Sequence, residues 1–233
     1  MTDKVIAQKD YESSVIIRHA KNAKHISLRI DGTIRQGVLV LPPNISEEEG
    51  LEFAKKNKKW LNEQIARLPP FVPFHDGVSI PFRGKQLSVQ HGGSTRGLVK
   101  LDGERLIVFG RQEHFRRRLT DWLKSQARCE IGKLVTNKSL KIGCKAGRIA
   151  IRDQKGRWGS CSSNGNLAFS WRLIMAPSFV LDYVVAHEVA HLVEHNHSCA
   201  FWNVVRSLTN HTDGGRIWLK HEGLQLHRYG KKV

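Results

Sequence analysis

Residues 177–191 read PSFVLDYVVAHEVAH, an apolar run that closes on the motif His-Glu-x-x-His. Pro177 and Ser178 are typical of a helix start, and the segment that follows them is apolar on nearly every side. We therefore expect a central, buried helix here. Because an α-helix turns once in about 3.6 residues, His187 and His191 should lie on one face, one turn apart.

Two histidines in this position can hold one metal ion, and Glu188 stands at the edge of the same face. Zinc lowers the pKa of a bound water toward ~7, and the carboxylate of Glu188 can take the proton as that water attacks a peptide carbonyl. The alternative is that both histidines are core residues hydrogen-bonded to the backbone. Burying two imidazoles without partners would cost free energy, so we predict that they bind a metal, one Zn²⁺ per chain.

A catalytic zinc site takes a third protein ligand and leaves the fourth position to water. The sequence offers His195 and His197. If the helix continued, His195 would point away from the metal, whereas Asn196 can cap the helix in a left-handed turn and swing the chain back. We favour His197 as the third ligand, with His195 and Cys199 as alternatives.

The segments around this helix predict further elements of the same region. Residues 147–174 indicate paired strands, which we expect to form a small antiparallel sheet over the helix, with an edge that could bind an extended peptide. Apolar residues at helical spacing predict a helix from about Phe115 to Leu134. Ser198 is expected to cap another helix over residues 199–208.

The first 110 residues predict a β-rich region with one helix. Alternating apolar residues between 13 and 41 indicate an antiparallel meander, and more strands are expected between 78 and 109. Ser46 and Glu49 form a capping box for one helix that runs through Ile65 and ends before Pro69. We accordingly predict an α+β fold with a β-rich region at 1–110 and a catalytic core at 111–233.

Composition limits the class of protein. The 233 residues are 40% hydrophobic and 25% charged, as in ordinary globular proteins. No stretch approaches 18 consecutive apolar residues, and the opening residues lack the apolar core of a secretory signal, so we expect no membrane association and a cytoplasmic location. The four cysteines form no Cys-x-x-Cys pair and are expected to be free, mostly buried thiols.

The chain is strongly basic. It has 38 Lys and Arg against 21 Asp and Glu, a net charge of +17. Such an excess favours association with polyanions such as nucleic acid or nucleotide phosphates. The alternative is merely a basic surface, because the basic residues are spread along the chain and only Arg116-Arg117-Arg118 forms a tight run.

A series of motifs makes the pattern specific to one family. It comprises residues 157–161 (RWGSC), 166–167 (NL), 171–177 (WRLIMAP), 182–192 (DYVVAHEVAHL), 196–198 (NHS) and 201–202 (FW), with 24–30 (KHISLRI) and 41–43 (LPP) near the N-terminus. The series closely resembles the YgjP-like metallopeptidase family, a relative of the SprT-like and WLM zinc proteases, over most of the chain. The resemblance implies a minimal zincin core, SprT-like or gluzincin-like, behind a β-rich extension.

Carried onto this sequence, the resemblance implies metal ligands at His187, His191 and His197 and a general base at Glu188. It also puts residues 157–161 near the active cleft. Arg157 and Trp158 are therefore candidates for substrate binding, with a structural salt bridge as the alternative for Arg157.

Three functions follow from these observations. The first is a zinc-dependent metallohydrolase of peptidase type, acting on proteins or peptides. The second is a UTP-type nucleoside triphosphate pyrophosphatase using the same metal site, since family members have been connected with UTP hydrolysis. Against it, the chain has no Gly-rich phosphate loop and no carboxylate cluster suited to magnesium. The third is a nucleic-acid-associated, SprT-like protease or binding module.

Overall fold

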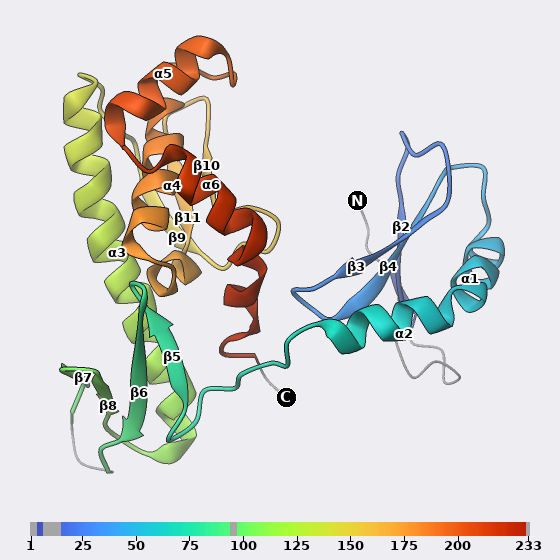
Figure 1. Ribbon diagram of the computed structural model, residues 1–233, viewed down its shortest axis with the longest axis horizontal. Helices are drawn as coiled ribbons and strands as arrows, with labels where there is room; N and C mark the ends of the chain where they lie inside the picture. Colours follow the sequence, from blue (N-terminus) through green and yellow to red (C-terminus); the bar gives the residue numbers. More distant parts are fainter. Residues whose placement is uncertain (1–3, 7–14, 94–96, 232–233) are drawn as a thin grey trace. The chain divides into compact units, whose positions relative to one another are not determined.

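The computed structural model describes residues 4–6, 15–93 and 97–231 and divides into two compact units, Met1–Pro70 and Phe71–Val233. Figure 1 shows their helices and strands. By contacts, residues 71–110 group with the second unit, whereas the boundary predicted from the sequence lies at 110/111. The difference arises because the strands of this segment share one hydrophobic core with the buried helix near the C-terminus.

The first unit is a four-stranded sheet with two helices. Its elements are β1 (Lys4–Ile6), β2 (Val15–His19), β3 (Ser27–Asp31), β4 (Gln36–Leu41), α1 (Glu47–Lys56) and α2 (Lys58–Arg67). The order is β1-β2-β4-β3, with β2 parallel to β4. The predicted antiparallel meander is wrong at this pair, because β4 inserts between β2 and β3. Alternating apolar residues predict strands but not which neighbours they take.

The predicted helix of this unit is present but interrupted. The capping box is confirmed: the Glu49 N–H donates to Ser46 Oγ over 3.1 Å, and the Ser46 N–H donates to Glu49 Oε2 over 3.4 Å. The helix then breaks at Asn57, whose side-chain amide donates to the Phe53 carbonyl over 2.8 Å. Asparagine side chains compete in this way for backbone partners, and the segment consequently forms α1 and α2 instead of one helix.

The second unit contains two sheets and a long helix. The first sheet has the order β5-β6-β8-β7, with β6 parallel to β8. The second has the order β10-β11-β9. The elements are β5 (Ser79–Phe82), β6 (Lys85–His91), β7 (Val99–Asp102), β8 (Arg105–Val108), η1 (Gln112–His114), α3 (Phe115–Lys141), β9 (Ile149–Arg152), β10 (Gly159–Cys161), β11 (Leu167–Ser170), η2 (Trp171–Met175), α4 (Ser178–Ala190), α5 (Cys199–Leu208), α6 (Thr212–His221) and η3 (Gly223–Arg228).

Helix α3 connects the parts of this unit. It contacts strands of both sheets as well as α4, and Figure 1 shows it running alongside them. Its apolar residues recur at helical spacing from Phe115 through Leu119, Leu123, Ala127 and Ile131, and all five are buried. The predicted helix is therefore confirmed, and it extends one to two turns beyond the predicted end.

The sheet beside α4 is mixed. Strand β11 lies in the middle, antiparallel to β10 and parallel to β9. The prediction of an antiparallel sheet is therefore wrong for β9. The loop between β9 and β10 places these two strands apart from each other. Strand β11 then lies between them and pairs with both.

Other expectations from the sequence have mixed outcomes. Among the described residues, no helix combines the length and apolarity that a membrane span requires. All four cysteines are free, as predicted, but the expectation that most are buried is wrong. Cys129 and Cys199 are exposed because they stand on the outward faces of amphipathic helices α3 and α5.

A buried ion pair joins α3, α4 and the end of α5. Lys138, only 5% exposed, places its Nζ 2.6 Å from Asp182 Oδ1 and donates to the Leu208 carbonyl over 2.8 Å. The Thr209 hydroxyl donates to Asp182 Oδ2 over 2.5 Å. Asp182 therefore ties the first turns of α4 to the residues that end α5.

We predict that Lys138→Met lowers the free energy of unfolding by about 2–4 kcal/mol, because it leaves the Asp182 carboxylate without its counter-ion. Arg117→Met is the control: it breaks the exposed pair of Arg117 with Asp121 and should change stability by less than about 1 kcal/mol. Urea unfolding followed by tryptophan fluorescence measures both. Equal stabilities of the two variants would contradict the structural role of Lys138.

Candidate metal centre

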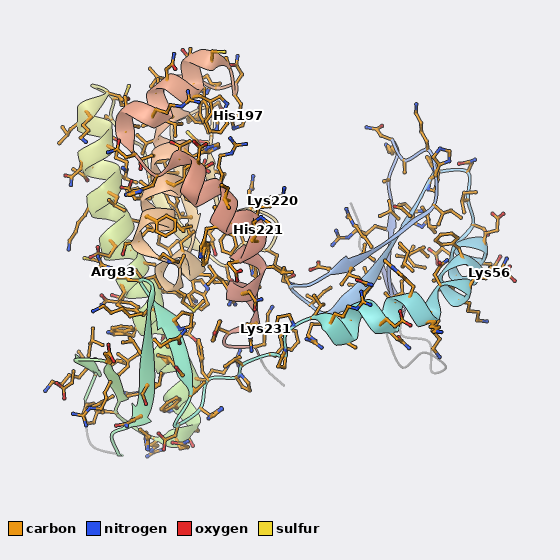
Figure 2. All side chains as sticks on the ribbon, in the orientation of Figure 1. Lys56, Arg83, His197, Lys220, His221 and Lys231 are labelled. Atoms are coloured by element: carbon orange, nitrogen blue, oxygen red, sulfur yellow. The ribbon has the colours of Figure 1, made fainter. Side chains whose placement is uncertain are left out.

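Three imidazole rings meet at the end of helix α4. His187 lies in its last turn, and His191 is the residue that ends it. His197, labelled in Figure 2, lies in the segment before α5. One ring nitrogen from each can be chosen so that all three lie within 4.8 Å of one another. Nε2 of His187 is 3.1 Å from Nε2 of His197. His195 and Cys199, the two alternatives for the third position, are not part of this group.

The spacing fits a metal ion. Two nitrogens bound at ~2.05 Å to a tetrahedral zinc are ~3.3 Å apart, close to the observed approach. Nδ1 of His191 lies 2.9 Å from the Glu194 carbonyl, an interaction that leaves Nε2 of that ring to face the other two histidines. Three imidazoles with open nitrogens on one side are a donor set that suits Zn²⁺ and related divalent metals.

The turn that carries His197 is built differently from the prediction. Asn196 was expected to adopt a left-handed conformation, but its backbone is not in that region. Its side-chain oxygen instead accepts the Ser198 N–H over 3.2 Å, and Ser198 Oγ accepts the Phe201 N–H over 3.3 Å, starting α5 at the predicted residue. Two consecutive side-chain caps therefore reverse the chain, as Asx and N-cap motifs do.

Phe201 is the packing surface of the three histidines. Its ring centroid lies 4.6 Å from that of His191, 4.7 Å from that of His197 and 4.9 Å from that of His187, and the residue is fully buried. A rigid aromatic ring in contact with all three imidazoles limits their orientations. The sequence placed Phe201 in the core, but nothing in its spacing singled out this contact.

The environment favours the neutral form of His187 and His191. Burial, followed by the charges of His191 and His197, lowers the pKa of His187 to about 4. Burial also lowers the pKa of His191, against the effect of its hydrogen bond to Glu194. A neutral imidazole has the free lone pair that a metal needs, so His187 and His191 do not have to lose a proton at pH 7 before binding an ion.

The Glu188 side chain lies against Gly159 of strand β10. Glu188 is 7% exposed, and burial raises the pKa of its carboxyl to about 7, with the nearby Arg157 guanidinium acting in the other direction. A Cβ on Gly159 would lie 2.5 Å from Glu188 Cγ and 2.6 Å from Oε1. Only glycine leaves room for this carboxylate, and an isolated glycine in a strand is the sequence signal that could have revealed the approach.

The two residues predicted to bind substrate, Arg157 and Trp158, have different environments. Arg157 is exposed and close enough to affect Glu188, whereas Trp158 stacks on His227 of η3 with ring centroids 5.0 Å apart. The Trp158 side chain also lies against Gly223. The Trp158 side chain therefore packs against the C-terminal segment η3.

Tyr183 of α4 and Arg216 of α6 both lie near the histidine cluster. The Tyr183 ring centroid is 6.0 Å from that of His187, and burial raises the pKa of its hydroxyl, with the Arg216 guanidinium acting in the other direction. Arg216 also stands 5.0 Å from the Trp202 ring and contributes to the low pKa of His187. Arg216 was not singled out from the sequence, where it follows two glycines without any recognisable motif.

Comparison with known proteins identifies the family. The model of the YgjP-like metallopeptidase domain matches residues 24–222. This chain belongs to the YgjP-like metallopeptidase family. The match includes the histidine cluster, strand β10 and most of the first unit.

Among solved structures, the YgjP-like chain is similar to the metallopeptidase zymogen abylysin of Pyrococcus abyssi, with 21% identity, 40% of this chain and 95% of that chain covered, and a TM-score of 0.35. It is also similar to the zymogen jannalysin of Methanocaldococcus jannaschii, with 22% identity, 39% and 91% coverage, and a TM-score of 0.34. No curated protein matches.

We predict that Gly159→Ala lowers hydrolytic turnover at least tenfold while zinc affinity stays within about twofold. The three atoms nearest to the new methyl group all belong to Glu188, so the methyl group displaces this carboxylate, and a shift of about 1 Å at a reacting group is worth on the order of 10²-fold in rate.

The matched control is Gly156→Ala in the preceding loop, where an added Cβ meets no atom within 4 Å. Steady-state hydrolysis and competition for zinc with a chromophoric chelator measure the two quantities. Wild-type turnover in Gly159→Ala would show that the close approach of β10 does not set the position of Glu188.

Proposed function

We propose that this protein is a zinc-dependent peptidase in which His187, His191 and His197 hold the ion and Glu188 is the general base. The observation that carries the proposal is that three imidazole rings lie together and that a buried carboxylate, Glu188, directly follows the first of them in the chain. Their grouping supports the ligand set that the sequence favoured.

When bound there, zinc would polarise the scissile carbonyl and make water acidic enough to react near neutral pH. Glu188 would accept the proton of the attacking water and return it to the leaving amine. A carboxyl whose pKa lies near the working pH is suited to both transfers. The Arg157 guanidinium favours the ionised form, so that the carboxylate is available as a base despite its burial.

Strand β10 offers a place for the substrate backbone. It is an edge of its sheet and, among the described strands, pairs with β11 alone. It also packs on α4, where Gly159 touches Glu188. An extended peptide added to this edge would run past the proposed base, because strand addition aligns main chains at about 4.8 Å. Arg157, exposed at the start of β10, could then bind a carboxylate of the substrate.

The other two functions considered from the sequence stay predictions. A UTP-type pyrophosphatase would use the same ion and base, and a nucleic-acid-associated protease would add a second binding surface. Peptide and nucleotide substrates must therefore be tested side by side.

Glu188→Gln should retain zinc and lose about 10²–10⁴-fold in peptide hydrolysis, because the amide cannot accept a proton. Glu222→Gln, the same change at an exposed position of the second unit, should hydrolyse peptides as the wild type does. A fluorogenic unfolded protein and UTP are the two substrates, each assayed with stoichiometric zinc.

Undiminished proteolysis by Glu188→Gln would exclude this residue as the base. Pyrophosphate release from UTP that depends on Glu188, without proteolysis, would overturn the peptidase and establish the nucleotide function.

A further inference from the structure

The outer face of the β10-β11-β9 sheet has a floor of small side chains. The strand register places Ser160, Ala168 and Ala150 side by side across the three strands. Their neighbours Gly159 and Phe169 face helix α4 and the core, and successive residues of a strand point to opposite sides. The row of Ser160, Ala168 and Ala150 therefore faces away from the histidine centre and lies at the bottom of a hollow of about 770 Å³.

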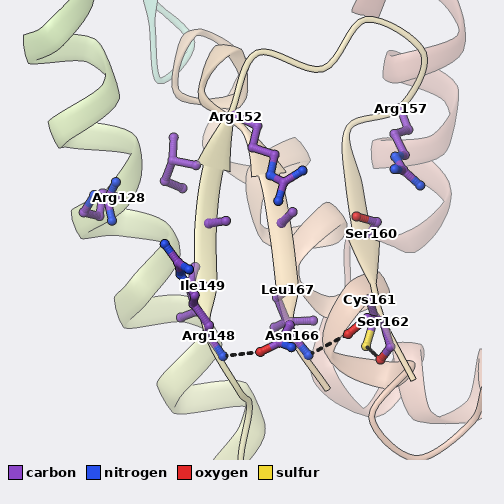
Figure 3. Close-up of a pocket in the computed structure, with 13 residues that line it drawn as sticks. Arg128, Arg148, Ile149, Arg152, Arg157, Ser160, Cys161, Ser162, Asn166 and Leu167 are labelled. Carbon is purple, nitrogen blue, oxygen red and sulfur yellow. Dashed lines mark hydrogen bonds between the residues drawn. The ribbon is translucent and has the colours of Figure 1, made fainter. Parts of the chain in front are cut away.

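Four arginines surround this hollow. Figure 3 shows Arg128 on helix α3, Arg148 and Arg152 at the two ends of β9, and Arg157 before β10. All four are exposed. Within the described part of the chain, none of their guanidinium groups forms an ion pair or a hydrogen bond.

Three other exposed arginines of this unit differ in this respect, whereas the exposed Arg206 and Arg216 likewise form no ion pair with the described residues. Arg83, Arg105 and Arg117 each pair with a carboxylate at 3.4 Å. The described residues that line the hollow include no Asp or Glu, and their remaining polar side chains are Ser160, Cys161, Ser162 and Asn166. Four like charges at one hollow repel each other, and an anion placed among them would remove that repulsion.

The span of the charges requires an extended anion. Arg148 and Arg152 are four residues apart on one strand, about 13 Å, and three strands are about 10 Å wide. A single carboxylate or phosphate cannot reach across this area. Guanidinium groups bind phosphate oxygens in pairs, and a chain of phosphates supplies them at regular intervals.

We infer that this face of the sheet binds the phosphate backbone of a nucleic acid. The floor of alanine and serine offers none of the side-chain pockets by which peptides are selected. The described lining has no aromatic ring on which bases could stack, so the contacts are to phosphates and binding is independent of base sequence. The net charge of +17 acts in the same direction at longer range.

The surface is separate from the histidine centre but adjoins it. Ser160 faces the hollow, whereas the preceding residue, Gly159, touches Glu188. A peptide added to the β10 edge would lie beside that strand and a nucleic acid on the outer face of the sheet, and Arg157 borders both places. The inference does not depend on zinc or on Glu188.

Fluorescence anisotropy with a fluorescein-labelled, mixed-sequence 20-nucleotide DNA strand tests this surface on the full chain. The triple variant Arg128→Ala, Arg148→Ala, Arg152→Ala should weaken binding at least tenfold. It should also lower the slope of log K against log salt by about 2, since each phosphate contact on a single strand contributes roughly 0.7. The control is Arg105→Ala, Arg111→Ala, Arg117→Ala, which removes the same charge from exposed positions elsewhere and should alter affinity less than about twofold.

Circular dichroism and zinc affinity verify that both triple variants are folded. Equal losses in the two triple variants would overturn the inference, because binding would then follow net charge alone. Displacement of the DNA strand by polyglutamate at an equal concentration of charge would also overturn it, in favour of an acidic peptide. Unchanged binding by Glu188→Gln would support the separation of this surface from the catalytic residues.

Discussion

The close approach of three imidazole rings at the end of a buried helix is the constraint on which the centre depends. Their nitrogens face one another within 4.8 Å, so a proton on one ring disfavours a proton on the next. Burial adds to this effect and keeps His187 neutral. The arrangement is held from outside by Phe201, which contacts all three rings, and by the caps that turn the chain into α5. An ion among these nitrogens would replace their mutual repulsion by coordination.

The same helix turn determines the place of the carboxylate. Glu188 follows His187 directly, so it points about 100° away, toward strand β10. There it is almost without solvent, and its carboxyl has a pKa of about 7. The strand can approach so closely because residue 159 is glycine. Strand β10 thus has two roles in this account: one side confines the proposed base, and the other contributes to the arginine-lined hollow.

Much of the local structure could be predicted from the sequence because its causes are local. The apolar run before His187 predicted α4, and Ser198 predicted the start of α5 at Cys199. Two of the three failures named next depend on contacts between segments that are apart in the chain, whereas the break at Asn57 comes from a local side-chain bond to Phe53. The parallel position of β9, the break at Asn57 and the role of Phe201 follow from pairing, side-chain bonding and packing that periodicity does not encode. The choice of His197 over His195 agrees with the geometry, although the turn that positions it is formed by the Asn196 side chain and not by a left-handed residue.

We propose that three histidines and no other side chains hold the metal. Anomalous X-ray diffraction at the zinc edge, on crystals of the zinc-loaded protein, tests it most directly. We expect one peak, ~2.0–2.1 Å from a ring nitrogen of each of His187, His191 and His197, with Glu188 outside the ligand set. A peak bound by His195, by a cysteine sulfur at ~2.3 Å or by the Glu188 carboxylate would contradict it.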